Sequence, residues 1–488
     1  MKTSEQPAAA LPIQHLMDAS GVRFGTSGAR GLAADMTAEI CFAYTAAFLQ
    51  VVGTASGQSG GRVALGMDLR PSSPDIARAC AAAIQHAGLE ADFCGVLPTP
   101  ALAYYAQEHG IPAIMVTGSH IPFDRNGIKF YRASGEITKA DEAGIAAASV
   151  TLPGELRLAP LPAVNLQAQR RYIARYLDFF ARNALAGMRL GFYQHSSVAR
   201  DLLSELLQAL GAEVIALGRT DQFVPIDTEA VAAADIEQAR RWAAEHRFDA
   251  ILSTDGDADR PLLGDERGDY LRGDVVGILC AQALAADAVA TPVSSNTALE
   301  KCGAFAQLVR TRIGSPFVIE GMEKLIAQGA QKVVGFEANG GFLVGSPLEK
   351  DGRVLQPLPT RDAVLPIIAL LAMARARGVP VSQLPASLPP RYTASDRIQN
   401  FAAADSRRLL QGLAASAAAL DDFLAPLALQ AAAIDQTDGL RITLDNSEIV
   451  HLRPSGNAPE LRCYAEAASQ ARADALAHAC LRRIAAAA

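Results

Sequence analysis

The sequence predicts an α/β protein of several domains whose last domain belongs to a different, α+β class. Two observations predict this class: a strand–helix–strand pattern recurs along the chain, and the pattern changes over roughly the last hundred residues. Length sets the scale, because 488 residues correspond to about three to four domains of ordinary size.

The recurring unit is a strand, a helix that ends at a glycine, and a second strand. It occurs at residues 62–96, where helix 75–86 ends at Gly88, and again at 188–217, where helix 198–210 ends at Gly211. A weaker copy covers residues 292–334. Repeated units of this kind indicate related domains with mostly parallel sheets.

The last part of the chain has another order of elements. An Ala-rich helical stretch at 402–420 precedes three short strands and a final helix at 469–485. The three strands are expected at 440–444, 448–452 and 460–465. This order favours a small α+β domain, and Pro-rich stretches at 153–162 and 379–390 are typical of linkers.

Composition excludes several classes of function. The formal net charge of −7 argues against a nucleic acid or a membrane surface as partner. Seven cysteines without a Cys-x-x-Cys pair suit a reducing compartment and disfavour a zinc site. The N-terminus lacks the apolar core of a signal peptide, and the apolar run 363–374 is too short to cross a bilayer. We therefore expect a cytoplasmic protein.

A polar stretch places a hydroxyl, an imidazole and an amine soon after a buried strand. Ser119 and His120 follow the apolar run 111–116, and Lys129 comes shortly afterwards. Because α/β proteins place their chemistry at the carboxyl ends of strands, Ser119 is a candidate for catalysis. A surface serine in a turn explains the same residues.

The sequence Asp-Gly-Asp-Ala-Asp-Arg indicates metal binding. Asp255, Asp257 and Asp259 follow the apolar strand 248–252, and three such carboxylates repel one another unless a cation joins them. Gly256 is expected to let the backbone curl so that all three face one point. Oxygen ligands favour Mg²⁺, since a calcium loop would need a glycine at its sixth position. The alternative is a solvated acidic loop.

Three further loops suit anions or sugar hydroxyls. Residues 20–31 combine four glycines with two arginines, and residues 335–341 place a Glu and an Asn two positions apart. Residues 453–459, with an arginine just beyond, offer guanidinium, hydroxyl and amide groups to a phosphate. Each loop can also be read as a plain tight turn.

Taken together, these stretches resemble the α-D-phosphohexomutase superfamily, and most of all its bacterial phosphomannomutase/phosphoglucomutase members. The resemblance covers nearly the whole chain, in family order. It rests on Phe24 to Gly31, Thr117 to Pro122 with Asn126 to Lys129, Asp255 to Arg260, Glu337 to Gly340, and Arg453 to Arg462.

This resemblance implies four domains around a central cleft: three related α/β domains with mixed or parallel sheets, and a C-terminal α+β domain. The expected domains are 1–155, 160–262, 263–378 and 385–488. They would carry, in this order, the phosphoserine loop, the metal-binding loop, the sugar-binding loop and the phosphate-binding loop.

The resemblance also implies residue roles. Ser119 would carry a phosphoryl group and bind Mg²⁺ together with Asp255, Asp257 and Asp259. The groups that stabilise charge or move protons would be Arg30, Lys129 and Arg260, supported by His120. Sugar hydroxyls would be held by Glu337 and Asn339. The phosphate that does not react would be held by Arg453, Ser455, Gly456, Asn457 and Arg462.

The implied activity is that of a phosphohexomutase, which moves a phosphoryl group between the ends of a hexose through phospho-Ser119 and a hexose 1,6-bisphosphate, also the activator. Mannose phosphates are the expected substrates, with glucose or glucosamine phosphates as alternatives. A metal-dependent phosphatase that uses Ser119 and a non-enzymatic sugar-phosphate binder are alternatives from other classes. The working form is expected to be a monomer or homodimer.

The sequence departs from the family's pattern in three motifs. Gly341 stands where the sugar-binding loop commonly has His, which leaves a proton-transfer role unfilled. The phosphate-binding loop commonly reads Gly-Thr-Glu-Pro, whereas residues 456–459 read Gly-Asn-Ala-Pro, so phosphate or domain contacts would differ. Ile121 stands where Asn is frequent, which affects a local turn contact.

Overall fold

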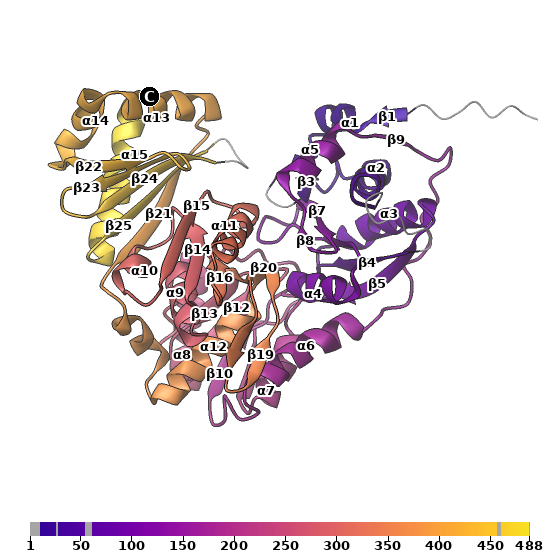
Figure 1. Ribbon diagram of the computed structural model, residues 1–488, viewed down its shortest axis with the longest axis horizontal. Coiled ribbons are helices and arrows are strands. Elements are labelled where there is room, and N and C mark those ends of the chain that lie inside the picture. The colour runs from indigo at the N-terminus through magenta and orange to yellow at the C-terminus, as the bar shows by residue number, and fades with distance from the viewer. Residues whose placement is uncertain (1–9, 26–27, 54–60, 456–459, 488) are drawn as a thin grey trace, which may run out of the picture.

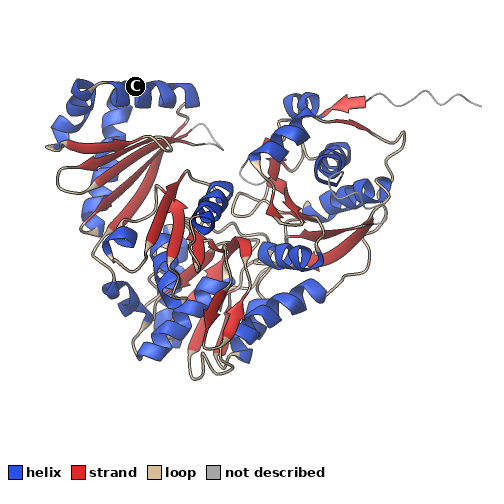
Figure 2. Cartoon of the chain, viewed as in Figure 1, coloured by secondary structure: helices blue, strands red, loops and turns tan. Residues whose placement is uncertain are grey.

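The computed structural model describes residues 10–25, 28–53, 61–455 and 460–487. Four large sheets follow one another along the chain and form an arc in Figure 1, with the first and last sheets at its two ends. Figure 2 shows helices flanking each of these sheets.

The first sheet is mixed. Its path is β2 (Arg23–Phe24), β3 (Gly28–Leu32), β7 (Arg125–Arg132), β6 (Ala113–Val116), β4 (Arg62–Met67) and β5 (Glu90–Val96), and β8 (Gly135–Glu136) pairs with β7. Alternate side chains of β4 face opposite cores. Val63 and Leu65 pack with helices α2 (Ala38–Phe48) and α3 (Ser73–His86), whereas Ala64 packs with α4 (Thr99–His109).

The second and third sheets repeat the arrangement at the centre of the first. The second is β11 (Glu213–Leu217), β10 (Arg189–Tyr193), β12 (Ala250–Thr254) and β13 (Pro261–Gly264). The third is β15 (Gln307–Thr311), β14 (Ala288–Pro292), β16 (Val333–Phe336), β17 (Phe342–Val344) and β20 (Leu358–Asp362). In all three sheets, three parallel strands are followed by an antiparallel neighbour: β7, β13 or β17. The repeat is confirmed, but each sheet is mixed.

The fourth sheet is antiparallel throughout. Its order is β21 (Tyr392–Gln399), β25 (Glu460–Ala467), β24 (Ile449–Pro454), β23 (Leu440–Leu444) and β22 (Ala431–Asp435). The sequence predicts three of these strands and misses β21 and β22. The predicted helix at 402–420 is two helices, α13 (Ala403–Ala415) and α14 (Ala417–Leu424), because Ser416 is extended and its side chain caps α14. The last helix is α15 (Gln470–Ala487).

The first three sheets share a continuous apolar core. It joins α4 to α6 (Gln167–Phe179), α7 (Leu202–Ala209), α9 (Gly273–Ala283) and α12 (Val364–Arg377). The fourth sheet packs its own core against α13, α14 and α15. The interdomain geometry of the first three sheets therefore rests on buried apolar surface.

One predicted helix is shorter than expected because the residues before it contact the acidic loop. The pattern predicts helix 198–210, but α7 begins at Leu202. The preceding residues form turns instead, and the backbone N–H of Val198 donates to the carbonyl of Gly256. This segment therefore supports the acidic loop.

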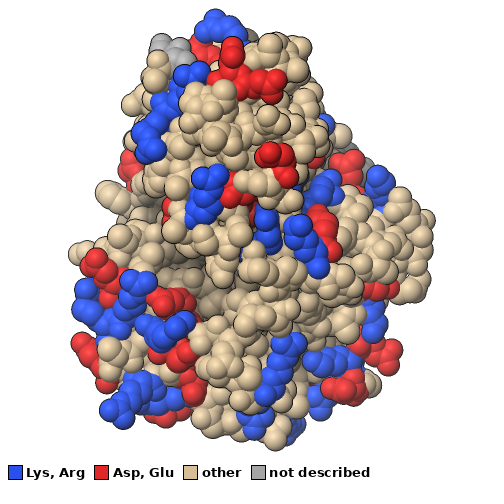
Figure 3. Space-filling model, turned by 90° about the vertical axis from the view of Figure 1, so that its left-hand side faces the viewer, with Lys and Arg blue, Asp and Glu red and all other residues tan. Residues whose placement is uncertain are grey.

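The apolar helices and the surface charges bear on whether a membrane or a charged partner could bind this protein. Among the described helices, none alone is long and apolar enough to cross a membrane. The pair α12 and Val381–Ser387 meets that test only together, bent by 88°. On the face drawn in Figure 3, Lys and Arg side chains lie interspersed with Asp and Glu.

The stacked pair Phe130 and Phe48 tests the packing of the first sheet. Their ring centroids lie 4.7 Å apart, and both side chains are fully buried. Phe130→Ala should lower the stability of the first domain by about 3–5 kcal/mol, because it removes a large buried side chain and leaves a cavity. Thermal unfolding followed by circular dichroism measures the loss. Phe123→Ala is the matched control, since Phe123 is 63% exposed. An equal loss in both variants would contradict the packing described.

Candidate active site

Four of the five loops singled out for chemistry, all but residues 20–31, occupy the same structural position in their sheets. Each lies in the hairpin between a strand and its antiparallel neighbour: β6 and β7, β12 and β13, β16 and β17, and β24 and β25. Each of the first three loops follows the carboxyl end of a parallel strand, where α/β folds place their ligands. The repeated topology therefore presents three different loops in equivalent positions.

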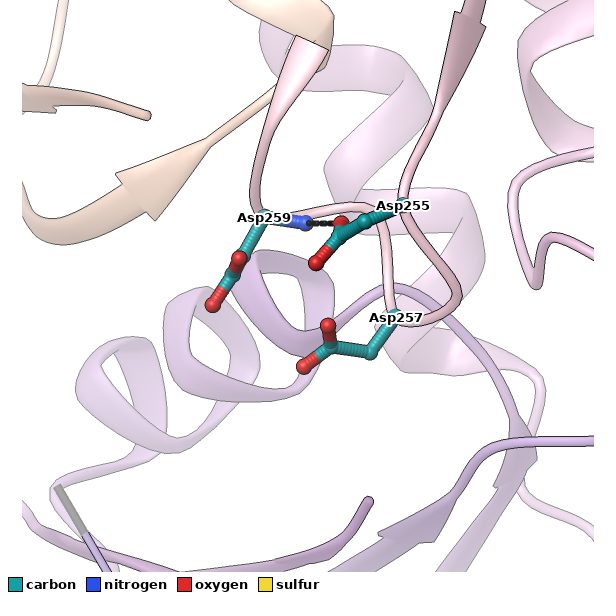
Figure 4. A group of neighbouring side chains, drawn as sticks. All are labelled: Asp255, Asp257 and Asp259. Carbon is teal, nitrogen blue, oxygen red and sulfur yellow. Dashed lines mark hydrogen bonds between the residues drawn. The ribbon is translucent and has the colours of Figure 1, made fainter. Parts of the chain in front are cut away.

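The acidic loop brings three buried carboxylates together (Figure 4). Asp255 Oδ1 accepts the backbone N–H groups of Asp259 and Arg260, each at 3.2 Å. Asp257 Oδ2 accepts from Thr99 Oγ1 at 2.6 Å and from Lys129 Nζ at 2.7 Å. One oxygen of each of these carboxylates is thus held by a donor.

The remaining oxygens suit a metal ion. One ligand oxygen from each of Asp255, Asp257 and Asp259 lies within 4.8 Å of the others. In the described part of the chain, Asp257 Oδ1 and Asp259 Oδ1 are buried without a hydrogen-bond partner. Buried carboxylate oxygens without partners are costly, and a hard divalent cation would satisfy both.

The pKa values of Asp255 and Lys129 are both raised at this loop. Burial, reinforced by Asp257 and Asp259, raises the pKa of Asp255 well above its usual value. Burial disfavours the charged form of Lys129, but Asp257 and Asp259 outweigh it and raise the pKa of the Lys129 amine. Lys129 is therefore a fixed positive charge, which also donates to Asp259 Oδ2 at 2.7 Å.

Gly256 matters to the acidic loop because it has no side chain. The left-handed backbone of the loop falls on Ala258, with φ of 55°, and Gly256 is not among the glycines with positive φ. The expectation that Gly256 provides the curl is therefore wrong. A Cβ at Gly256 would lie 2.9 Å from the carbonyl oxygen of Ser119 and 3.1 Å from the Phe223 ring. Gly256 thus permits the close approach of the acidic and serine loops.

Ser119 lies against the acidic loop. Its hydroxyl donates to Asp255 Oδ2 at 2.6 Å, and the residue is fully buried. Its φ of 55° is unusual for serine, a strain that clusters at functional sites. The Thr117 hydroxyl compensates by accepting the Ser119 N–H at 2.8 Å. The structure therefore brings Ser119 and the three aspartates together, as the sequence predicts.

Arg70, which the sequence did not single out, holds the serine loop in shape. Its guanidinium donates to the carbonyls of Ser119, Ile121, Pro122 and Arg125 at 2.6–3.0 Å. It is buried, pairs with Asp68 at 3.2 Å and stacks on Phe223 at 3.9 Å. The Asp-x-Arg after strand β4 was the available signal.

His120 and Arg30 lie at the edge of the same site. His120 Nδ1 lies 3.3 Å from Ser119 Oγ. Burial, together with Arg260 and Arg30, lowers the pKa of His120 well below its usual value, so its ring is neutral at neutral pH. Burial and the neighbouring Arg260 lower the pKa of Arg30 to about 10. Arg260 Nε lies 3.6 Å from Asp259 Oδ1.

The sugar-binding loop connects to the acidic loop through an arginine that the sequence did not single out. Glu337 Oε2 accepts from Arg361 Nη1 at 2.8 Å, and the same guanidinium donates to Asp259 Oδ2 through Nη2 at 2.9 Å. Asn339 Oδ1 accepts the N–H of Gly341 at 2.9 Å, so this side chain shapes the loop. Arg361 lies in strand β20, a stretch without turn or ligand signals in the sequence.

Strands β24 and β25, which flank the phosphate-binding loop, belong to the last sheet, at the other end of the arc from β7 of the first sheet (Figure 1). Arg453 and Arg462 are direct neighbours on β24 and β25. Like charges in this position destabilise a sheet unless an anion joins them. Arg453 pairs with Asp438 at 3.0 Å, and the N–H of Ser455 donates to the carbonyl of Glu460 at 2.8 Å. The predicted ligands Gly456 and Asn457 lie outside the described residues.

Comparison with known proteins identifies four matching domains along the chain. The phosphoglucomutase/phosphomannomutase α/β/α domains I, II and III match residues 21–152, 170–268 and 272–392. The C-terminal domain of the same family matches residues 399–483. The order of the matches is the order of the four sheets.

Relatives of known name agree. The chain is 50% identical to a phosphomannomutase of Salmonella muenchen over 459 residues, which are 93% of this chain and 94% of the relative. It is 45% identical to a phosphomannomutase of Sinorhizobium fredii over 453 residues, or 92% and 95% of the two chains. A phosphoglucosamine mutase of Deinococcus deserti is 30% identical over 378 residues, or 74% and 79%.

Solved structures share the fold. A phosphoglucomutase/phosphomannomutase family protein of Burkholderia thailandensis superimposes with a TM-score of 0.70 at 20% identity, over 95% of this chain and 96% of that one. The phosphoglucomutase parafusin of Paramecium, in its open form, gives 0.68 at 15% identity, over 91% and 89%. This chain belongs to the phosphoglucomutase/phosphomannomutase family.

Proposed function

We propose that this protein is a phosphohexomutase that interconverts mannose 1-phosphate and mannose 6-phosphate through a phosphoserine at Ser119. The observation that carries the proposal is the contact of Ser119 Oγ with the carboxylate of Asp255, 2.6 Å long, inside a buried group of three aspartates. The mannose assignment is supported by the two phosphomannomutase relatives at 50% and 45% identity.

Mg²⁺ is the cation that suits the acidic loop. Asp255, Asp257 and Asp259 would hold it together with an oxygen of phosphorylated Ser119, since all its ligands are then hard oxygens. When bound, it supplies positive charge that offsets the charge of the transferring phosphoryl group. Lys129 and Arg361 hold Asp257 and Asp259 in place through their other oxygens.

The reaction needs positioning and charge neutralisation more than covalent help. In the first half, the Oγ–P bond of phospho-Ser119 breaks as the free hydroxyl of a hexose monophosphate bonds to phosphorus. That hydroxyl loses its proton, and the released Oγ of Ser119 gains one. Lys129 and Arg260 supply fixed positive charge beside the transferring group. His120 Nδ1 lies 3.3 Å from Ser119 Oγ, within reach of the proton that this oxygen gains or loses.

The second half restores the phosphoserine. The hexose 1,6-bisphosphate turns end for end, and its other phosphoryl group moves to Ser119, which regenerates the starting enzyme. Arg453 and Arg462 form a second anion site on the last sheet, and they can hold whichever phosphate is not reacting. Glu337 and Asn339 lie in the loop that would grip sugar hydroxyls.

The compartment follows from the cysteines. All seven cysteines of the chain lie in described segments, and each is a free thiol. Free thiols suit a reducing compartment, so we place this activity in the cytoplasm.

Loss of the Ser119 hydroxyl tests the phosphoryl carrier. Ser119→Ala should lower kcat by about 10⁴-fold or more, because the nucleophile itself is removed. Intact-mass measurement after incubation with hexose 1,6-bisphosphate should show one added phosphoryl group in wild type and none in the variant. Ser416→Ala, which alters only a helix cap, should remain phosphorylated. Stoichiometric phosphate release without isomerisation would instead identify a phosphatase.

Removal of one aspartate charge tests the metal. Asp257→Asn should lower kcat/KM by about 100-fold or more, because a bound cation contributes several kcal/mol of charge stabilisation. Calorimetric titration should show weakened Mg²⁺ binding, independently of activity. Asp221→Asn is the control, since the Asp221 side chain is 99% exposed in the same domain. Full turnover in excess chelator would contradict the metal assignment.

Sugar preference is tested with three substrates. Mannose, glucose and glucosamine 1-phosphates should all be offered in coupled assays under one condition. We expect mannose 1-phosphate to give the highest kcat/KM, by about tenfold or more, because a site built for one hydroxyl configuration loses hydrogen bonds with the other. A higher value for glucose or glucosamine would overturn the mannose assignment, and no turnover of any would overturn the mutase.

A further inference from the structure

Arg361 joins two loops that no other described hydrogen bond joins. Its Nε and Nη2 both donate to Asp259 Oδ2, at 3.2 and 2.9 Å, and its Nη1 donates to Glu337 Oε2 at 2.8 Å. The side chain is only 3% exposed. A planar guanidinium with three donors in fixed directions sets the distance between its two carboxylate partners, which a lysine cannot do.

Gly341 provides the space in which Arg361 lies. A Cβ built at Gly341 would lie 2.7 Å from Cδ and 2.8 Å from Cγ of Arg361, and 3.0 Å from the carbonyl oxygen of Asp259. Gly341 has no positive φ, so its backbone does not require glycine. A side chain at this position would therefore have to displace the stem of Arg361.

The residues on either side of Arg361 are anchored to different parts of the molecule. Thr360 Oγ1 donates to Glu136 Oε1 at 2.8 Å, in the first sheet. Asp362 Oδ1 accepts from the Tyr172 hydroxyl at 2.6 Å and from the Val364 N–H at 2.8 Å, and Tyr176 donates to its other oxygen. Strand β20 is thus held on both sides of Arg361, which limits the positions its guanidinium can take.

Arg361 cannot exchange a proton in this setting. A guanidinium stays protonated in proteins, and this one pairs with the carboxylates of Asp259 and Glu337 at 2.9 and 2.8 Å. It is therefore not a substitute for a proton-transferring histidine. What it can do is hold a carboxylate still.

We propose that Arg361 is a positioning residue that locks Glu337 of the sugar-binding loop to the acidic loop. Position 341 is glycine because a side chain there would displace Arg361. Arg361 and Glu337 together set which hexose hydroxyl is presented to Ser119. This inference rests on the proposed phosphohexomutase function. Glu337 is tied through Arg361 to Asp259, which in turn donates its backbone N–H to Asp255, the partner of Ser119. Glu337, which would bind the sugar, and Ser119, which would carry the phosphoryl group, are therefore connected by one chain of hydrogen bonds.

A double-mutant cycle tests the proposal. Gly341→Ala and Arg361→Ala should each lower kcat/KM for mannose 1-phosphate by about 100-fold, because each breaks the charged link. The double variant should lose little more than Arg361→Ala alone, since the Arg361 stem is then gone and the added methyl group meets only the carbonyl oxygen of Asp259, at 3.0 Å. Losses that multiply, to about 10⁴-fold, would show that Gly341 acts independently and would overturn the proposal.

Controls separate positioning from folding. Gly154→Ala adds a Cβ with no atom within 4 Å and should leave activity unchanged. Arg361→Lys keeps a charge beside Asp259 and should fold even where Arg361→Ala does not. It should lower the mannose-to-glucose ratio of kcat/KM by about tenfold, because it cannot bridge both carboxylates. An unchanged ratio with a lowered melting temperature would mean a structural role only and would overturn the proposal.

Two further measurements keep this test apart from the test of function. Titration calorimetry on a Ser119→Ala background should show weaker binding of mannose 6-phosphate when Arg361→Lys is added. Wild type is assayed alongside: no turnover in wild type would refute the mutase itself, whereas active wild type with unaltered binding and ratio would refute only the role of Arg361.

Discussion

Lys129 and Arg361 bind Asp257 and Asp259 through buried ion pairs, and the rest of the site depends on these pairs. The four charges come from three different sheets, so the pairs fix the loops of those sheets relative to one another. Removing one partner of a buried pair leaves an uncompensated charge and costs about 3–5 kcal/mol. The paired charges therefore oppose separation of the three sheets, because separating them would leave buried charges without partners.

The cations also divide the oxygens of the acidic loop. Lys129, Thr99 and Arg361 donate to Oδ2 of Asp257 or Asp259, whereas Oδ1 of both has no hydrogen-bond partner among the described residues. These hydrogen bonds preorganise the Oδ1 atoms as cation ligands, because they prevent the Asp257 and Asp259 carboxylates from rotating. The same geometry holds Ser119 against Asp255, in a strained backbone that the Thr117 and Arg70 hydrogen bonds sustain.

A repeated topology explains how loops distant in sequence meet. In each of the first three sheets, the loop that carries the candidate site residues connects the third parallel strand to an antiparallel neighbour. One apolar core holds these sheets together. The last sheet has a core of its own and carries the arginine pair Arg453 and Arg462. A separate core suits the role proposed for this sheet, which is to hold the phosphate that does not react.

The sequence by itself determined the strand–helix repeat, the acidic loop and the placement of Ser119 after a buried strand, because periodicity, glycine stops and alternating carboxylates are local signals. The sequence analysis missed strands β21 and β22. It also gave the wrong reason for the glycine at 256, because the close approach of Gly256 to Ser119 is a long-range contact. Only the tertiary structure decided that Arg70 and Arg361 belong to the site. Sequence does not show what either arginine contacts, even with the Asp-x-Arg signal at Arg70, because their partners come from loops up to about a hundred positions away. Gly341 likewise acquires its meaning only when the stem of Arg361 is seen lying over it.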